Sequence, residues 1–351
     1  MSALSRLYSG DVTYDFIGRR RRWFVVSTVL VVASILFIAL RGFNFGIEFK
    51  GGASFQFPAN GHSVTSVQKA LSSVGVTEPT VQTVGQGQLR VTTPPLTTEA
   101  RFTAVENALA TATGNPVTKL NPSTVGASWG SQITSKALQG LVIFLVVVAI
   151  YIAIRFEGRM AIAAFVALLH DLLITAGVYS AVGFEVTPST VIAVLTILGF
   201  SLYDTVVVFD KVRENTTGFT KSRLTYAELA NLALDQTLMR SINTSLIALL
   251  PVAALLFVGA GILGVGTLKD LALAQFVGLA VGAYSSIFLA TPLLVVLKER
   301  EPAVIQHDAR IARQRRARGI TADDVLGRTP AGASAAAAGV PTTEGQATTG
   351  G

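Results

Sequence analysis

Six long apolar stretches constrain this sequence more than any other feature. An α-helix needs about 20 predominantly apolar residues to cross the hydrocarbon core of a bilayer. The stretches that approach this length are Trp23–Leu40, Leu138–Ile154, Met160–Val182, Thr190–Lys211, Ile242–Leu263 and Leu271–Leu297. Only 14% of the 351 residues are charged, against about 25% in an average soluble domain. The sequence therefore predicts an α-helical membrane protein with six transmembrane helices.

The positions of Lys and Arg predict how these helices are oriented, because short cytoplasmic loops carry an excess of both residues. Four arginines, Arg19–Arg22, precede the first stretch, and a basic run from Lys298 to Arg318 follows the last. The other basic residues on this side are Arg155, Arg159, Lys211, Arg213, Lys221, Arg223 and Arg240. On the opposite side, Gly183–Ser189 has none and Gly264–Asp270 has only Lys269. We therefore expect both termini on the cytoplasmic side of the membrane.

The segment 42–136 differs from the rest of the chain because it is polar and rich in Thr, Ser, Gln and Val. The expected topology puts it outside the cytoplasm, between the first two helices. Its periodicities predict the order β-α-β-β-α-β, from Ala53–Phe57, Val64–Ser73, Thr80–Val84, Leu89–Thr93, Thr98–Ala112 and Val117–Leu120. This order is typical of a ferredoxin-like α+β domain. We expect a binding role, since the segment shows no spacing typical of a hydrolase or a metal site.

The remaining segments complete the predicted domain organisation. Residues 1–22 form a basic cytoplasmic N-terminus, and 23–41 form the first transmembrane helix, which no small-residue cleavage site follows. Residues 137–297 contain helices two to six. In the basic cytoplasmic segment 298–328, we expect Arg310–Arg318 to lie on the inner leaflet, and the low-complexity tail 329–351 to be disordered.

Composition narrows the chemistry that this chain can perform. The sequence has no cysteine, which excludes disulfides and thiolate nucleophiles, and its three histidines are too widely separated to predict a metal site. We expect no cofactor and no phosphate-binding loop. The net charge of +7 is concentrated beside the apolar stretches. This placement favours contact with anionic membrane lipid over binding of nucleic acid.

Acidic residues inside the apolar stretches are the candidate functional residues, since such a side chain at mid-bilayer costs about 2.5–3.5 kcal/mol. Asp171 lies near the middle of the third stretch beside His170, and one polar cavity could receive both. The alternatives are a neutral Asp171 bonded to a neighbouring helix and a His170 that only packs. Asp204 lies about 10 Å from the cytoplasmic end of the fourth stretch. Asp210 fits an interfacial network with Arg213 near the headgroups.

A polar stripe leads into the fifth stretch and contains a second candidate group. Gln236, Arg240, Asn243 and Thr244 recur at helical spacing. Arg240 could simply anchor the helix at the cytoplasmic surface. The stripe continues into the apolar segment, however, and this favours an interhelical partner, for which Asp204 is the natural candidate. Protonation of Asp204 would release Arg240, so the pair suits proton coupling, with Asp171 as a further site.

Several blocks of residues resemble the SecF family of bacterial Sec protein-export subunits, within the resistance-nodulation-division superfamily. The blocks are Phe45–Gly52, which contains Gly46, Glu48, Gly51 and Gly52, then Leu169–Asp171, Tyr203–Asn215, Gln236–Ser245 and Leu268–Asp270. They occur in the family's order and on the predicted helices. The sequence departs from the family pattern at Glu48, where Asp is usual, and at Tyr203, where Asn is common.

This resemblance implies an auxiliary subunit, not an enzyme, that couples the proton motive force to late protein export. The implied partners are SecD, the SecYEG channel, the translocating preprotein and, indirectly, SecA; YajC and YidC extend this set. Two alternatives remain. One is a stand-alone proton-driven exporter of a small molecule or lipid, acting as an oligomer. The other is a passive scaffold whose polar residues only hold helices together.

Overall fold

A computed structural model describes residues 14–77, 79–84, 87–262 and 266–325 of the chain. These residues are mostly helical, with two small sheets. Six of the described helices are long and apolar enough to cross a membrane, namely Arg20–Arg41, Ser128–Arg155, Gly158–Val182, Pro188–Thr216, Tyr226–Gly259 and Lys269–Lys298. Each contains most of one predicted stretch. The predicted tail 329–351 and most of the basic N-terminus lie outside the described residues.

Two of the long helices begin at capping boxes that their sequences encode. Helix α8 (Pro188–Thr216) starts with Thr187, whose hydroxyl accepts the Thr190 N–H while the Thr190 hydroxyl accepts the Thr187 N–H. Helix α9 (Tyr226–Ala254) starts with the same exchange between Thr225 and Glu228. Each exchange satisfies two backbone donors that a helix start otherwise leaves free. The remaining helices of the bundle are α2 (Arg20–Arg41), α6 (Ala127–Arg155), α7 (Gly158–Val182), α10 (Gly266–Ser285) and α11 (Thr291–Lys298).

Two of these helices contain π-helical segments. Segment η3 (Leu255–Ile262) continues α9, and segment η4 (Ser286–Ala290) joins α10 to α11. Pro292 explains the second segment, because proline has no N–H to donate and its ring clashes with the carbonyl group four residues earlier. The α-helical pattern is therefore interrupted just before Pro292, and the sixth long helix changes geometry in its middle.

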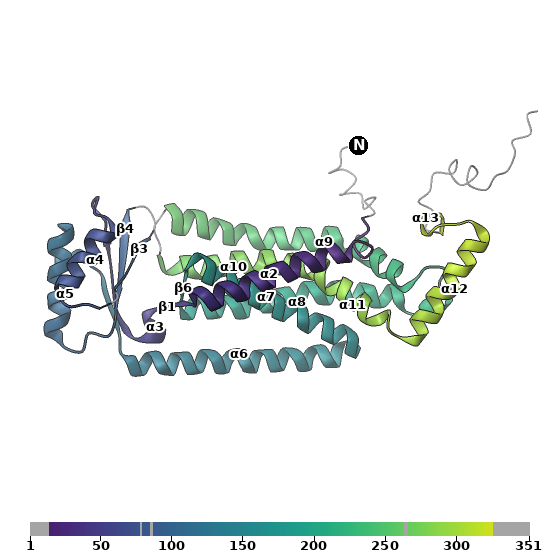
Figure 1. Cartoon of the computed structure of the whole chain (residues 1–351), viewed down its shortest axis with the longest axis horizontal. Helices are drawn as coiled ribbons and strands as arrows, with labels where there is room; N and C mark the ends of the chain where they lie inside the picture. The colour runs from purple at the N-terminus through teal and green to yellow at the C-terminus, as the bar shows by residue number, and fades with distance from the viewer. Residues whose placement is uncertain (1–13, 78, 85–86, 263–265, 326–351) are drawn as a thin grey trace, which may run out of the picture.

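The α+β domain follows the element order β2 (Gly52–Pro58), α4 (Val64–Ser73), β3 (Thr80–Val84), β4 (Gln88–Thr93), α5 (Glu99–Thr113), β5 (Pro122–Val125). Its sheet has the strand order β3-β4-β2-β5 with antiparallel pairs throughout. Alternate side chains of β2, including Phe55 and Phe57, are buried against the two helices, as period-two patterning requires. Helices α4 and α5 cover one face of this sheet (Figure 1).

Two predicted boundaries of this region are wrong. The expected strand Val117–Leu120 is instead a 3-10 helix, η1 (Val117–Lys119), and the last strand starts only at Pro122. The tight turn buries Leu120 completely in the domain core, and this burial outweighs the strand preference of Val117. Helix α6 begins at Ala127 rather than at the predicted Leu138, because its first turns pack against the short helix α3 (Ile47–Lys50).

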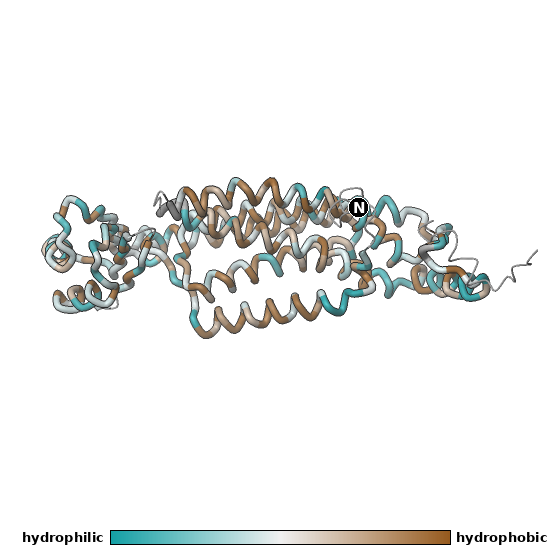
Figure 2. The backbone as a smooth tube through the Cα atoms, turned by 90° about the horizontal axis from the view of Figure 1, so that it is seen from above, coloured by the Kyte–Doolittle hydropathy of each residue, from teal (hydrophilic) through white to brown (hydrophobic). Residues whose placement is uncertain are grey.

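The bundle connects two polar ends of an elongated molecule. The α+β domain lies at one end and helix α12 (Pro302–Arg318) at the other (Figure 1). Hydrophobic residues dominate the helices between them (Figure 2). Helix α10 packs against α7, α8 and α9, whereas α6 runs along the side of the bundle (Figure 1). A two-stranded parallel sheet, β1 (Asn44–Phe45) with β6 (Glu185–Val186), joins the end of α2 to the α7–α8 connection.

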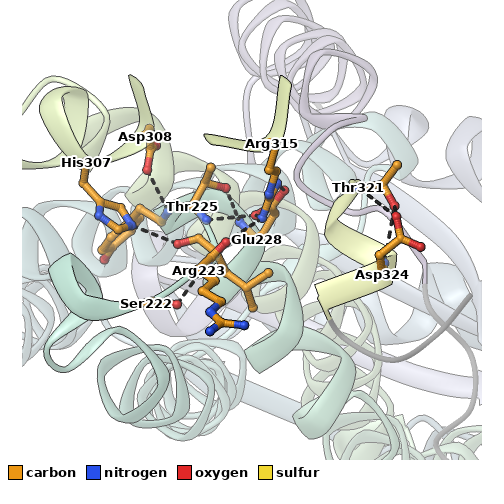
Figure 3. A network of polar contacts seen from close by, with 11 residues as sticks. Ser222, Arg223, Thr225, Glu228, His307, Asp308, Arg315, Thr321 and Asp324 are labelled. Carbon is orange, nitrogen blue, oxygen red and sulfur yellow. Dashed lines mark hydrogen bonds and ion pairs between the residues drawn. The ribbon is translucent and has the colours of Figure 1, made fainter. Parts of the chain in front are cut away.

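Helix α12 folds back onto the connection between α8 and α9. Figure 3 shows the Arg315 guanidinium on the Glu228 carboxylate, with nitrogen–oxygen distances of 2.6 and 2.8 Å. His307 Nε2 donates to the Leu224 carbonyl oxygen at 3.0 Å, and Arg310 donates to the Thr220 carbonyl oxygen. Arg310 and Arg315 therefore bind protein groups, while the placement of Arg310–Arg318 on the inner leaflet stays a prediction.

Candidate functional site

Asp171 is the most deeply buried acid of the bundle, with 1% of the residue exposed. Its Oδ2 atom accepts hydrogen bonds from Ser201 Oγ of α8 at 2.5 Å and from Ser285 Oγ of α10 at 2.7 Å. Its Oδ1 atom lies 3.1 Å from Nδ1 of the neighbouring His170. Three polar groups from three helices therefore surround one carboxylate in an apolar bundle.

Asp204 has the same kind of surroundings one helix further on. It is 3% exposed, and its Oδ1 atom accepts a hydrogen bond from Ser241 Oγ of α9 at 2.8 Å. Its Oδ2 atom accepts a hydrogen bond from Ser286 Oγ of η4. Two serine hydroxyls thus face each acid, and they satisfy the polar atoms that burial would otherwise leave without partners.

These residues form one continuous group, which we call the acid–serine cluster, consisting of Asp171, Asp204, Ser201, Ser241, Ser285 and Ser286. Two helices hold it together. Helix α8 supplies Ser201 to one acid and carries the other acid one turn later, while Ser285 and Ser286 are consecutive and reach different acids. In the described part of the chain, no Lys or Arg forms an ion pair with either acid. A change of charge at Asp204 would therefore break no ion pair with Lys or Arg, and the basic side chain beside Asp171 is the titratable His170.

Two glycines let α10 approach α8 closely enough to form this cluster. A Cβ atom on Gly278 would collide with the side chain of Ile197, and one on Gly282 would lie 3.0 Å from Ser201 Cβ. Contacts this short require the neighbouring side chains to move. The glycines therefore bring the Ser285 and Ser286 hydroxyls within hydrogen-bond distance of acids on two other helices.

His170 joins the acid–serine cluster at Asp171 and is 6% exposed. Its ring stacks on Tyr284 with 6.3 Å between the ring centroids. Its Nε2 atom is buried and has no hydrogen-bond partner among the described residues. The structure thus brings His170 and Asp171 into direct contact, while a polar cavity shared by the two stays a prediction.

The structure does not pair Asp204 with Arg240. Arg240 is exposed on the outward face of α9, and the next residue, Ser241, occupies the position beside Asp204. Consecutive helix residues point about 100° apart, so only one of the two can face the bundle interior. Gln236 and Asn243 of the predicted polar stripe are also exposed, and Thr244 Oγ1 bonds to the Arg240 carbonyl oxygen. Arg240 and Asn243 therefore lie on the exposed side of α9, whereas Gln236 Oε1 accepts a hydrogen bond from Asn215 Nδ2 of α8 at 3.0 Å.

Asp210 and Arg213 do not bond to each other as predicted. Asp210 Oδ2 accepts a hydrogen bond from Arg155 Nη2 of α6 at 2.8 Å, and both side chains are about 40% exposed. On the surface of α8, Lys211 forms an ion pair with Glu214. Exposed pairs of this kind contribute only about 0–1 kcal/mol. Asp210 therefore serves as a surface contact between α6 and α8.

The glycine motif after the first helix forms the joint between the bundle and the α+β domain. Gly46 is the N-cap residue of α3 and donates its N–H to the Val186 carbonyl oxygen at 2.9 Å. Gly51 has a φ of +75° and Gly52 a φ of +140°, both unfavourable for residues with a Cβ atom. A Cβ on Gly52 would also collide with the Thr93 carbonyl oxygen. The two glycines therefore permit the sharp change of direction from α3 into β2.

Sequence reasoning missed a group of charges at this joint. Arg90 of β4 lies 3.2 Å from Glu185 of β6 and 4.0 Å from Asp270 of α10. Burial raises the pKa of Glu185, Arg90 opposes this effect, and the charge of Glu48 adds to it. The available signal was the pair of acids, Glu185 and Asp270, in two short connections that are otherwise nearly uncharged. The ion pair links the α+β domain directly to the end of the bundle.

The four serines of the acid–serine cluster were missed as well. Serine is common in helices, where its hydroxyl usually bonds to a backbone carbonyl of the preceding turn. The available signals were the spacing of Ser201 and Asp204, one helical turn apart, and the consecutive Ser285 and Ser286 within an apolar stretch. Neither signal predicts which acid a serine reaches, because that depends on how the helices pack.

Two family descriptions match this chain. The description "Protein export membrane protein SecD/SecF, C-terminal" matches residues 104–300, and "SecD/SecF GG Motif" matches residues 36–60. The first range contains the whole acid–serine cluster, and the second contains Gly46, Glu48, Gly51 and Gly52.

The chain is also similar to individual proteins of known sequence or structure. The protein translocase subunit SecF of Mycobacterium tuberculosis is 52% identical, over 90% of this chain and 74% of that protein. The SecF subunit of Streptomyces coelicolor is 51% identical, over 85% of this chain and 80% of that protein. A crystal structure of SecDF, a translocon-associated membrane protein from Thermus thermophilus, matches with a TM-score of 0.75 and 34% identity. That match covers 83% of this chain and 39% of the SecDF chain. These similarities and the six apolar helices identify a multi-pass membrane protein.

Proposed function

Because this chain belongs to the SecD/SecF family of protein export membrane proteins, we propose that it couples proton movement to protein export. It acts as a transport subunit of the Sec translocase rather than as an enzyme. The observation that carries this proposal is the pair of buried acids, Asp171 and Asp204, each bonded only to neutral or titratable partners. A buried acid without a permanent cation is suited to binding and releasing a proton.

We infer the orientation of the protein from its charge. Both termini lie in the cytoplasm, since basic residues gather at the connections near α12 and are scarce at the connections near the α+β domain. The α+β domain then lies outside the cytoplasmic membrane of a bacterium. In this orientation Asp171 is closer to the outer surface than Asp204. Each proton that the membrane potential drives inward releases about 2.3 kcal/mol of free energy per 100 mV.

We further propose that SecD covers the exposed polar stripe of α9. Arg240 and Asn243 are exposed on a helix that is long and apolar enough to cross the membrane. A charged side chain is costly against lipid, so Arg240 requires a polar partner from another chain. The SecDF structure supports SecD as that chain, because the matched region makes up only 39% of a longer protein. Arg240 would then contribute to coupling across the interface rather than through a bond to Asp204.

The α+β domain is the part that we propose to contact the preprotein. Its element order and its sheet order, β3-β4-β2-β5 with two helices, support a ferredoxin-like binding domain. In the complete machine, this chain and SecD dock on the SecYEG channel, SecA drives the earlier step from the cytoplasm, and YajC and YidC are further neighbours. Gly51 and Gly52 would let the domain change its angle to the bundle.

Substitution of the acid and the stripe arginine tests this function. We expect Asp204→Asn and Arg240→Met to abolish the ionophore-sensitive part of preprotein export in cells depleted of the native subunit. The asparagine keeps the size of the side chain but cannot be ionised, so loss of export would follow from lost protonation. Asp210→Asn, on the surface of the same helix, is the matched control and should export normally. Normal export by Asp204→Asn would contradict proton coupling at this site.

Purification in mild detergent tests the partners separately. We expect SecD and the channel to be recovered with this chain, and Asn243→Leu to weaken recovery of SecD because Asn243 lies on the exposed stripe. Recovery of a homo-oligomer alone would instead support a stand-alone exporter.

A further inference from the structure

The four serine hydroxyls of the acid–serine cluster are not equivalent. Among the described residues, Ser201 and Ser241 have only a carboxylate as hydrogen-bond acceptor. Ser285 Oγ also lies 3.2 Å from the Gly282 carbonyl oxygen, and Ser286 Oγ lies 3.3 Å from the Ala283 carbonyl oxygen. A hydroxyl has one proton to donate, so each of these two serines can bond either to its acid or to the backbone. The serines of the sixth long helix therefore have two available states.

We propose that Ser285 and Ser286 are hydrogen-bond switches that let Asp171 and Asp204 alternate between ionised and protonated forms. This inference rests on the proposed proton coupling and adds the residues that position the proton. With Asp204 ionised, Ser241 donates to Oδ1 and Ser286 donates to Oδ2, which satisfies an acceptor-only group. The structure contains both serine–carboxylate contacts together with the longer contact from Ser286 to the Ala283 carbonyl oxygen.

Protonation of Asp204 requires one of its donors to turn. The incoming proton binds Oδ2, and the new O–H group then needs an acceptor. The Ser286 hydroxyl rotates to donate to the Ala283 carbonyl oxygen, and its own oxygen accepts the Asp204 proton. Ser241 continues to donate to Oδ1. Every polar atom stays bonded in both states, so neither state leaves a buried group unsatisfied.

The same exchange is available at Asp171, where Ser285 is bonded to Oδ2 at 2.7 Å and has the Gly282 carbonyl as its second acceptor. Because Ser285 and Ser286 are consecutive and adjoin the π-helical segment η4, both exchanges change hydrogen bonds in the same turn of helix. π-helical turns often occur at functional sites. The end of α10 therefore responds to the protonation of both acids.

The titratable groups in the surrounding elements do not supply an alternative switch. Helix α7 contributes His170, which touches Asp171 and not Asp204. Helix α10 contributes Tyr284, whose hydroxyl is bonded to α2. Helix α9 contributes Arg240, the charged residue next to Ser241 in the sequence, and its side chain is exposed. Among the described residues, Ser286 is thus the one that contacts Asp204 and also has a second hydrogen-bond acceptor, the Ala283 carbonyl oxygen.

Infrared spectroscopy across a pH range tests this switch. The sample is the full-length chain in complex with SecD, reconstituted in lipid vesicles. The carboxyl C=O band of protonated Asp204 is first assigned by its loss in Asp204→Asn. We expect Ser286→Ala to raise the pH at which this band is half-maximal by about one unit or more, because the bond that the ionised carboxylate loses is stronger than the bond that the protonated form loses. Ser286→Thr retains the hydroxyl and should restore the wild-type midpoint. Ser180→Ala removes a buried hydroxyl that bonds only backbone carbonyls, and it should leave the midpoint unchanged.

The outcomes separate the switch from the proposed function. If Asp204→Asn keeps ionophore-sensitive export, proton coupling at this acid is wrong regardless of the serines. If Asp204→Asn loses export while Ser286→Ala titrates and exports like the wild type, the switch alone is wrong. Should Ser286→Ala fail to fold, Ser286→Cys replaces it, since a thiol is a weak donor of similar size. An unshifted midpoint in Ser286→Cys would equally overturn the switch.

Discussion

The acidic residues of the bundle differ in burial and in hydrogen-bond partners. These differences distinguish the candidates for proton coupling from the acids that only make surface contacts. Hydrogen bonds to charged groups contribute about 1.5–3 kcal/mol each, and Asp171 and Asp204 each accept two from serines in the buried interior of the bundle. Asp210 is about 40% exposed and paired with Arg155, where a pair is worth about 0–1 kcal/mol. Substitutions of the buried acids should therefore reduce preprotein export strongly, whereas substitutions of Asp210 should change it little.

The joint between the two parts of the molecule carries a pH dependence that can be tested at one residue. The pKa of Glu185 is raised, so the folded joint binds a proton more tightly than the unfolded chain does. This stabilisation is complete below the ordinary pKa of glutamate and is lost as the pH rises through the raised value. Arg90, Asp270, Lys269 and Glu48 face the same carboxyl group.

Hydrogen exchange at the Gly46 N–H, which bonds to Val186 between β1 and β6, measures this effect. Between about pH 4.5 and pH 8, we expect protection of this N–H in the wild type to fall more steeply than in Glu185→Gln. The neutral glutamine removes the titration of Glu185 while the other charges remain. Identical pH profiles for the two proteins would show that Glu185 does not control the joint.

At the scale of helices, the acid–serine cluster depends on how closely α10 packs against α8. Gly278 and Gly282 permit this approach, and Pro292 interrupts the helix just beyond Ser285 and Ser286. The position of one helix thus determines whether both serines reach their acids.

Adding a side chain at this contact tests that dependence. We expect Gly278→Leu to destabilise the purified chain in detergent by about 1–3 kcal/mol, because the leucine must displace Ile197. Gly199→Leu is the matched control, since a Cβ atom on Gly199 meets no neighbour within 4 Å. Thermal unfolding measures both variants. Equal midpoints for the two would mean that the α8–α10 contact is not tight.

The sequence predicted the long helices well because hydropathy over about 20 residues is a strong signal. Boundaries that depend on packing were less predictable. The first turns of α6 contact α3, and the strand expected at Val117–Leu120 is a 3-10 turn that buries Leu120. The intramembrane acids could be selected from their cost alone. Their partners could not, because Ser241 and Arg240 are adjacent and only the orientation of α9 determines which one meets Asp204.

At the scale of the whole molecule, an α+β domain and a docked helix α12 lie at opposite ends of the bundle (Figure 1). The ion pair between Arg90 and Glu185 connects the first end to the bundle, and the pair between Arg315 and Glu228 connects the second. The acid–serine cluster lies on the helices between these ends. Helix α10, which carries Ser285, also carries Asp270 beside Arg90, and helix α9, which carries Ser241, also carries Glu228.

Proton entry into vesicles during export tests the central claim most directly. Vesicles would contain this chain with SecD and the channel, a pH-sensitive dye inside, and an imposed proton gradient directed from the α+β side. We expect SecA, ATP and a preprotein enclosed inside the vesicles, at the cytoplasmic face of the complex, to increase proton entry through the wild-type complex and not through the Asp204→Asn complex. Equal stimulation of proton entry in both complexes would contradict proton coupling at Asp204.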